Sequence, residues 1–156
     1  MSDSHKVQRL LDLEEIRLLV AKYNFAFDTR DERSYLECWT EDGFVERRNS
    51  KPSCRGHAQL AALARDFPVN GRHLTTDVLI ELDGDHATMR NYMLYLDMGP
   101  PCEVSMFGVY HDKLVRTAEG WKFSERIFDP HTIRPSETSE AFMSAVSLAA
   151  DAAPRR

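Results

Sequence analysis

Hydrophobic residues in the N-terminal part of the chain recur at steps of three and four positions. They are Leu10, Leu13, Ile16, Leu19, Val20, Tyr23 and Phe27. This spacing predicts an amphipathic helix of about 20 residues that places Tyr23 on its buried face. Residues 29–32 have the spacing of a capping box, so we expect a short second helix that carries Trp39 and stops at a turn at residues 41–43.

The hydrophobic pattern changes from helical to alternating near the middle of the chain. Before that point we expect a short strand at Phe44 and Val45, and an alanine- and leucine-rich helix from Ala58 to Phe67. From Gly71 onward the period is two. This period predicts strands joined by hairpin turns, at residues 71–82, 86–97, 104–116 and 121–128. Helices first and hairpins afterwards is the order of an α+β fold.

Length and composition indicate one globular domain. A chain of 156 residues with 42% hydrophobic and 29% charged residues can bury a single compact core. We expect this domain to occupy residues 1–135. A C-terminal helix and tail are expected at residues 136–156.

Charge and hydropathy argue against several classes of protein. The net charge is −5 and basic residues cluster only in pairs, so no electrostatic footprint for nucleic acid is present. Apolar runs are too short for a membrane span, and the polar first residues lack a signal peptide's hydrophobic region, so we expect no membrane partner and a cytoplasmic location. The cysteines, Cys38, Cys54 and Cys102, are odd in number and widely spaced, which favours free thiols.

Sequence motifs for metal and nucleotide chemistry are absent. No group of His, Cys, Asp and Glu has metal-ligand spacing, and Asp83, Gly84 and Asp85 are explained as a hairpin turn. Glycine-rich phosphate loops and the serine hydrolase elbow do not occur. We therefore expect neither a metal nor a cofactor.

Three polar residues indicate acid–base chemistry. Tyr23 and Asp28 lie at the end of the first expected helix, and His73 opens the strand after Gly71. A histidine with an ordinary pKa of about 6.5 takes up a proton near neutrality, and a carboxylate can fix its tautomer. A carboxylate at a helix C-terminus is disfavoured by roughly 0.3–1 kcal/mol. Asp28 in that place therefore suggests a use.

Each candidate also has a purely structural explanation. Tyr23 fits a core tyrosine, Asp28 fits a turn cap, and His73 fits a partly buried strand histidine. Arg126, on the face that it would share with Ser124, fits a surface ion pair as well as a site residue. The pairing of Asp28 with His73 is what favours the functional interpretation.

Three segments resemble a known family. They are EEIRLLVAKYNFAFDTRDERSYLECWTEDGFVE at residues 14–46, GRHLTTDVLIELDGDHAT at residues 71–88 and FGVYHDKLVRTAEGWKFSERIFD at residues 107–129. In this order they resemble the SnoaL-like branch of the nuclear transport factor 2-like superfamily. The resemblance implies a cone-shaped α+β barrel, in which three helices wrap a strongly curved, mostly antiparallel sheet around an apolar pocket. One such pocket hosts many chemistries, so function has to come from the site.

The resemblance also implies roles for four residues. Scytalone dehydratase, bile acid 7α-dehydratase and hexachlorocyclohexane dehydrochlorinase are similar to this chain, and all eliminate without a cofactor. Asp28 falls on their pocket aspartate and His73 on their catalytic histidine. Tyr23 matches the catalytic tyrosine of the bile acid enzyme, and Arg126 matches an arginine of the dehydrochlorinase site.

Three positions depart from the pattern of relatives. Phe27 replaces a tyrosine of scytalone dehydratase, and Asp77 replaces an asparagine often found four residues after the histidine. Arg47 aligns with the general-base aspartate of ketosteroid isomerase. A guanidinium that stays protonated cannot shuttle a proton between carbons, which argues against an isomerase.

These observations together predict a cofactor-independent lyase that acts on an apolar cyclic or aromatic small molecule. Elimination and retro-aldol carbon–carbon cleavage both fit a His73 base oriented by Asp28. A polyketide-cyclase-like or isomerase-like enzyme and a non-catalytic apolar-ligand-binding module remain alternatives. The resemblance implies a homo-oligomer, with a trimer favoured over a dimer. The expected substrate-binding residues, which also fit a plain core, are Phe27, Trp39, Phe44, Arg47, Met89, Tyr95, Phe107 and His131.

Overall fold

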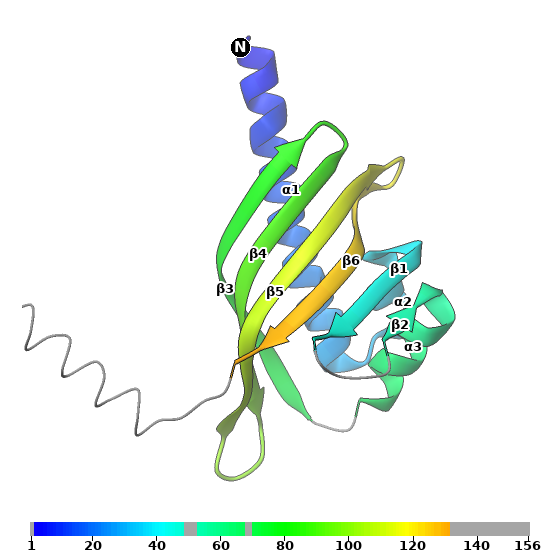
Figure 1. The fold of residues 1–156 in the computed structure, drawn as a ribbon, viewed down its shortest axis with the longest axis vertical. Helices are drawn as coiled ribbons and strands as arrows, with labels where there is room; N and C mark the ends of the chain where they lie inside the picture. Colours follow the sequence, from blue (N-terminus) through cyan, green and yellow to red (C-terminus); the bar gives the residue numbers. More distant parts are fainter. Residues whose placement is uncertain (1, 49–52, 68–69, 132–156) are drawn as a thin grey trace, which may run out of the picture.

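The computed structural model describes residues 2–48, 53–67 and 70–131 of the chain. Within these residues, helices and strands follow one another as shown in Figure 1. They are α1 (Asp3–Thr29), α2 (Glu32–Glu37), β1 (Trp39–Arg47), β2 (Cys54–Arg55), α3 (Gly56–Asp66), β3 (Gly71–Asp83), β4 (His86–Asp97), β5 (Glu103–Thr117) and β6 (Gly120–Pro130). The expected C-terminal helix and tail, residues 136–156, lie outside the described residues.

The strands form one curved sheet in the order β2-β1-β6-β5-β4-β3. Neighbouring strands are antiparallel except β1 and β6, which are parallel. α1 crosses one face of the sheet, and α2 and α3 lie beside β1 (Figure 1). The predicted α+β architecture is confirmed, but the sheet is not closed into a barrel. Among the described residues, the strands at its two edges are β2, which has 2 residues, and β3.

Helix α1 is longer than the hydrophobic pattern predicts, with 27 residues. Ser2 caps its start by accepting the N–H of His5, and Arg30 ends it in the left-handed conformation with φ 59°. Residues 3–11 are exposed and extend beyond the end of the sheet (Figure 1). The pattern detected only the part of the helix that packs on the sheet, whereas the cap sets where the helix begins.

Helix α2 and strand β1 divide differently from the prediction. Asp31 caps α2 by accepting the N–H of Ser34, and the helix ends at Glu37. Trp39 therefore belongs to a strand and not to the second helix. It lies in register with Phe123 of β6, and this parallel pairing extends β1 to nine residues. Pairing between distant segments outweighs local helix preference here.

The predicted hairpin of β3 and β4 is confirmed, and β3 contains a bulge. Gly84 makes the turn with φ 57°, a conformation that glycine adopts without strain. The ladder shifts register between Thr76 and Leu79. Asp77, inside this interval, has φ 55°, which is the left-handed region that Asp tolerates better than most residues. Bulges of this kind turn side chains away from strict alternation.

A second register shift, at Lys113 and Leu114, changes which residues of β6 point inward. Phe123 and Arg126 are both buried although they are three positions apart. The expectation that Arg126 shares a face with Ser124 is therefore wrong. Ser124 donates its hydroxyl to the carbonyl of Lys113 instead.

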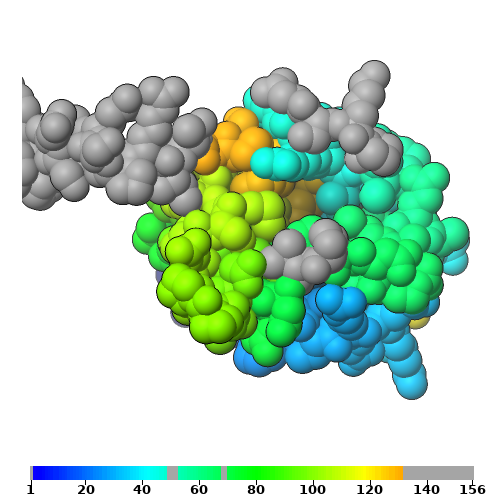
Figure 2. Space-filling model, turned by 90° about the horizontal axis from the view of Figure 1, so that it is seen from below, coloured from blue at the N-terminus to red at the C-terminus, as the bar shows by residue number. Residues whose placement is uncertain are grey.

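The core lies between the helices and the inner face of the sheet. One cluster includes Ile16, Tyr23, Tyr35, Trp39, Leu60, Met89, Leu114 and Phe123. A second cluster, of Met93, Tyr95, Tyr110 and Phe128, lies toward the end where α1 finishes and β3 begins. Figure 2 looks onto that end and shows it hollowed, with β6 visible between β1 and β5.

The cysteines and the membrane prediction can be compared with the structure directly. All three cysteines are free thiols, with Cys38 buried, Cys54 half-buried and Cys102 exposed. In the part of the chain that the structure describes, no helix combines the length and hydropathy needed to cross a membrane.

Candidate active site

Asp28 and His73 form a close pair between the last turn of α1 and the start of β3. The Nδ1 atom of His73 lies 2.6 Å from Oδ1 of Asp28, and the backbone N–H of His73 donates to Oδ2 over 2.8 Å. The side chains are 4% and 6% exposed, respectively. A carboxylate only accepts hydrogen bonds, so this contact assigns a proton to Nδ1, and in the neutral ring Nε2 is then the basic nitrogen.

Two donors to one carboxylate also explain how Asp28 is tolerated at a helix C-terminus. The negative end of the helix disfavours a carboxylate. The ring N–H and the backbone N–H of His73 together offset that cost, since hydrogen bonds to a charged group are stronger than neutral ones.

Aromatic rings enclose the imidazole of His73. Its centroid lies 4.7 Å from the ring of Tyr95, 5.2 Å from Phe27 and 6.3 Å from Tyr23, all edge to face. Rings at these distances exclude water and lower the local dielectric constant. A proton transfer at Nε2 would therefore take place in apolar surroundings.

A second buried group lies on the far side of Tyr23. The guanidinium of Arg126 makes two hydrogen bonds to Asp112, of 2.8 and 2.9 Å. Its central carbon lies 4.2 Å from the ring of Tyr23, 4.1 Å from Tyr110 and 4.2 Å from Phe123. The remaining nitrogen, Nη1, has no hydrogen-bond partner among the described residues.

The charges of this group follow from burial and pairing. Burial alone would lower the pKa of Arg126, but the Asp112 carboxylate more than offsets this and raises the pKa above its ordinary value. The arginine is therefore always protonated. Burial raises the pKa of the Tyr23 hydroxyl, and the charge of Arg126 opposes that rise. Tyr23 is a neutral phenol at neutral pH and can donate a proton or a hydrogen bond.

The structure brings the four expected catalytic residues together. Tyr23 touches both groups, with its ring 6.3 Å from the ring of His73 and 4.2 Å from the Arg126 carbon. A histidine, the carboxylate that it contacts, a neutral phenol and a fixed cation thus lie in one connected cluster. Such an arrangement can remove a proton and stabilise a developing oxyanion.

Four of the eight expected substrate-binding residues lie near this cluster. Phe27 and Tyr95 contact His73 directly. Trp39 is fully buried with its ring 5.9 Å from that of Tyr23, and Met89 belongs to the same core cluster. The enclosed position of Trp39 and Met89 makes them packing partners of the site in this structure.

The other four are not brought to His73. Phe107 pairs with Leu94 and stacks on Tyr92, which is 44% exposed on the face of the sheet away from α1. The ring of His131 packs against Phe107 on that face. Phe107 does not line the site, because it falls on the opposite phase of strand alternation from Met106 and Gly108. His131 follows the end of β6, is exposed, and packs on Phe107 instead.

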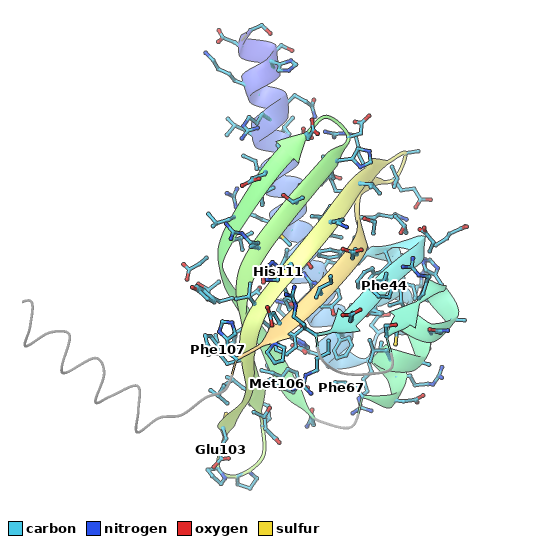
Figure 3. The ribbon with its side chains drawn as sticks, in the orientation of Figure 1. Phe44, Phe67, Glu103, Met106, Phe107 and His111 are labelled. Carbon is cyan, nitrogen blue, oxygen red and sulfur yellow. The ribbon has the colours of Figure 1, made fainter. Side chains whose placement is uncertain are left out.

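Phe44 and Arg47 belong to β1. Phe44 lies in register with Glu125, the neighbour of inward-pointing Arg126, and the guanidinium of Arg55 covers its ring at 4.5 Å (Figure 3). The expectation that Phe44 lines the pocket is therefore not met. Arg47 is exposed at the end of the strand, in register with Phe128.

Sequence reasoning missed Asp112 and its polar neighbours. His111 and Asp112 point to opposite faces of β5, as alternation predicts. Asp112 is the one that points inward, where it can pair with Arg126. Asp112 is buried together with Tyr110 and Leu114, two positions away on either side. That period-two pattern, facing an inward arginine on the paired strand, could have indicated the ion pair.

Asn91 of β4 and Tyr35 of α2 complete the buried polar group. Both amide atoms of Asn91 and the hydroxyl of Tyr35 lack a hydrogen-bond partner within the described residues. Burial raises the pKa of Tyr35 well above its ordinary value. In the described part of the chain, no three His, Cys, Asp or Glu side chains are grouped so that they could hold a metal ion.

Comparisons with known proteins identify the family. The model of the SnoaL-like domain matches residues 8–127. A protein of unknown function from Mycobacterium tuberculosis is 30% identical and has a similar structure, with a TM-score of 0.75 over 85% of this chain and 78% of that one. No curated protein sequence matches the chain.

Two structures from Novosphingobium aromaticivorans share the fold. One is an NTF2-like protein with a cystatin-like fold, 23% identical with a TM-score of 0.76 over 87% of this chain and 92% of that one. The other carries a provisional assignment as a scytalone dehydratase, and is 15% identical with a TM-score of 0.69 over 83% and 93%. Family match and fold agree, and this chain belongs to the SnoaL-like family.

Proposed function

We propose that this protein is a cofactor-independent lyase that eliminates water or a similar leaving group from an apolar cyclic or aromatic small molecule. The observation that carries the proposal is the buried pair of Asp28 and His73, joined at 2.6 Å and enclosed by aromatic rings. Membership of the SnoaL-like family and the structural neighbour provisionally assigned as a scytalone dehydratase support the same class.

In the proposed reaction His73 is the general base. Its Nε2 atom removes a proton from a carbon next to a carbonyl group of the substrate, while Asp28 holds the ring and stabilises the imidazolium that forms. The enolate then collapses to a carbon–carbon double bond as the bond to the β-hydroxyl breaks, and the imidazolium returns its proton to that oxygen, which leaves as water. Tyr23, a neutral phenol, donates to the oxygen on which negative charge develops. The positive charge of Arg126, which lies against the ring of Tyr23, stabilises that negative charge electrostatically.

The test is turnover of a panel of cyclic β-hydroxy ketones, which give conjugated or aromatic products with new ultraviolet absorbance when they lose water. We expect His73→Gln to lower kcat by about 10²–10⁴-fold, which is the usual contribution of a general base. Asp28→Asn should lower kcat as well, because the tautomer is no longer fixed. The matched control is His86→Gln, at an exposed histidine in the β3–β4 hairpin, which should keep wild-type turnover.

Two outcomes would overturn the proposal. If a panel member is turned over equally well by the wild type and a folded His73→Gln variant, His73 is not the base. If panel members bind but none is converted, and His73→Gln binds them with unchanged affinity, the protein is a binding module. Circular dichroism and thermal unfolding of each variant exclude loss of fold as the cause.

A further inference from the structure

A groove runs between α1 and the free edge of β3. Its volume is about 700 Å³, and its wall includes both Asp28 and His73. The groove therefore reaches Asp28 and His73 from the side of the sheet at which α1 meets β3. This edge is open because β3 is the last strand of the sheet.

One face of α1 forms the length of the groove. Arg17, Ala21, Asn24 and Asp28 lie on this face at steps of four, three and four, so they form a row along the helix. At a rise of 1.5 Å per residue, the row is about 16 Å long. Arg17 lies at one end of the row and the Asp28 carboxylate lies at the other.

Asn24 lies in the middle of the groove wall and links its two sides. Asn24 donates from Nδ2 to the hydroxyl of Thr75 on β3 over 3.0 Å, which ties the helix to the strand. Its carbonyl oxygen, Oδ1, is buried and accepts no hydrogen bond within the described residues. A buried acceptor of this kind is normally satisfied by a ligand or by ordered water.

Apolar side chains surround this row. Phe25 and Leu74 are 75% and 49% exposed and belong to the groove wall on α1 and β3. Val78, in the β3 bulge, lines the same groove. Large apolar side chains gathered around a concave surface mark a binding site more often than scattered exposed residues do.

The charges at the rim are positive. Arg17 has Glu14 as its nearest carboxylate, at 3.9 Å, and both side chains are more than half exposed. Arg72 donates to the carbonyl of Gly71 and makes no ion pair within the described residues. The carboxylate in the wall, Asp28, is already engaged by His73. The guanidinium of Arg17 is therefore available to bind an anionic group of a ligand, at the end of the row opposite Asp28 and His73.

We propose that this groove binds an elongated aromatic molecule with an anionic group, which lies along α1 with the anion at Arg17 and the ring system against Asp28 and His73. The orientation of the reacting part toward His73 rests on the proposed function, and binding in the groove does not. Ala21 gives the ring system room beside the helix.

Two fluorescent probes of the same shape test the proposal. Anilinonaphthalene sulfonate carries an aromatic ring system and an anion, and phenylnaphthylamine has the rings alone. We expect Arg17→Gln to weaken the binding of the sulfonate probe by about threefold at low salt, because a partly exposed charge pair is lost. The affinity for the neutral probe should not change. Ala21→Trp should weaken the binding of both probes by about tenfold or more, because an indole fills the groove.

The controls are matched by residue type and exposure. Arg9→Gln removes an exposed arginine from the same helix, and Ala118→Trp adds an indole at the exposed β5–β6 turn. Both should bind the two probes as the wild type does. Backbone amide resonances of Ala21, Asn24 and Thr75 should shift when the sulfonate probe is added.

Three results would overturn the proposal. The first is saturable probe binding that Ala21→Trp does not weaken, or no saturable binding at all. The second is an equal effect of Arg17→Gln on both probes. The third is a change in molecular mass in solution with Ala21→Trp, which would show that a second copy of the chain fills the groove. Since these readouts do not involve turnover, they fail or succeed separately from the His73→Gln test of the lyase.

Discussion

The carboxylate of Asp112 holds the guanidinium of Arg126 through two hydrogen bonds, and the two side chains are 0% and 1% exposed. Three aromatic rings pack against the same guanidinium. A pair without access to water depends entirely on its partners for compensation of charge. The stability of the protein should therefore respond strongly to the loss of either partner.

Loss of one partner should destabilise the protein strongly. We expect Asp112→Asn to lower the free energy of unfolding by about 3–5 kcal/mol, because Arg126 would be left as an uncompensated buried charge. Urea unfolding followed by circular dichroism measures the change. The neighbouring exposed pair of Lys113 and Glu125 is the control, and Lys113→Gln should change stability by less than about 1 kcal/mol.

A double variant separates charge compensation from packing. Asp112→Leu with Arg126→Met replaces the pair by apolar groups, and such replacements recover most of the stability lost in the single variant. A single Asp112→Asn variant as stable as the wild type would show that the two charges do not depend on each other.

The tautomer of His73 can be observed directly. Because Nδ1 lies 2.6 Å from Asp28, the neutral ring should carry its proton on Nδ1, and that proton should resonate far downfield. Nitrogen-15 correlation spectra of the imidazole distinguish the two tautomers. In Asp28→Asn the downfield proton should disappear. Its persistence in that variant would mean that another group holds the ring.

The cysteines should differ sharply in reactivity. Burial raises the pKa of the Cys38 thiol to about 11, so almost none of it is the reactive thiolate near neutral pH. Burial also raises the pKa of Cys54, whereas Cys102 is exposed. Alkylation followed by peptide mass spectrometry should find Cys102 modified first and Cys38 modified only after unfolding. Equal rates for Cys38 and Cys102 in folded protein would contradict this assignment.

Acid should weaken the link between α1 and the β5–β6 hairpin. The hydrogen bond from Arg116 lowers the pKa of Asp12 below its ordinary value of 3.8, although burial opposes it. The folded state therefore prefers the ionised form, and this stabilisation is present above 3.8 and is lost as the pH falls through the lowered pKa.

Asp12→Asn tests that pH dependence. The free energy of unfolding, measured from neutral pH to well below 3.8, should fall less steeply in the variant than in the wild type. Asp3→Asn, at the exposed start of the same helix, should keep the wild-type slope. A steeper slope in Asp12→Asn would show that the sign is wrong.

Sequence periodicity predicted most of the fold because each element has one buried face. The β4 strand was predicted with its observed bounds, since the turn at residues 83–85 and the Gly-Pro-Pro sequence at residues 99–101 mark its two ends. Trp39 was assigned to the wrong element because its partner is Phe123, far away in the chain. No local pattern reports a parallel pairing across that distance.

The close approach of Asp28 and His73 was predicted from the sequence, but much of what surrounds them was not. Asp28 and His73 could be chosen because their residue types combine into known chemistry. Phe107 was assigned to the pocket although aromatic type alone does not tell which face of a strand a side chain occupies. His131 lies beyond the last strand, where no alternation predicts its direction. A bulge between β5 and β6 places Arg126 on the inner face of the sheet. Such a one-residue shift in register cannot be predicted from the amino-acid composition.

The second hydrogen bond of Asp28 has a consequence beyond catalysis. A free edge strand presents backbone groups to which another chain can add, and β3 is such an edge. By accepting the backbone N–H of His73, Asp28 covers part of this edge. Because loss of this carboxylate leaves the N–H of His73 open to another strand, we expect Asp28 variants to be less soluble than His73 variants.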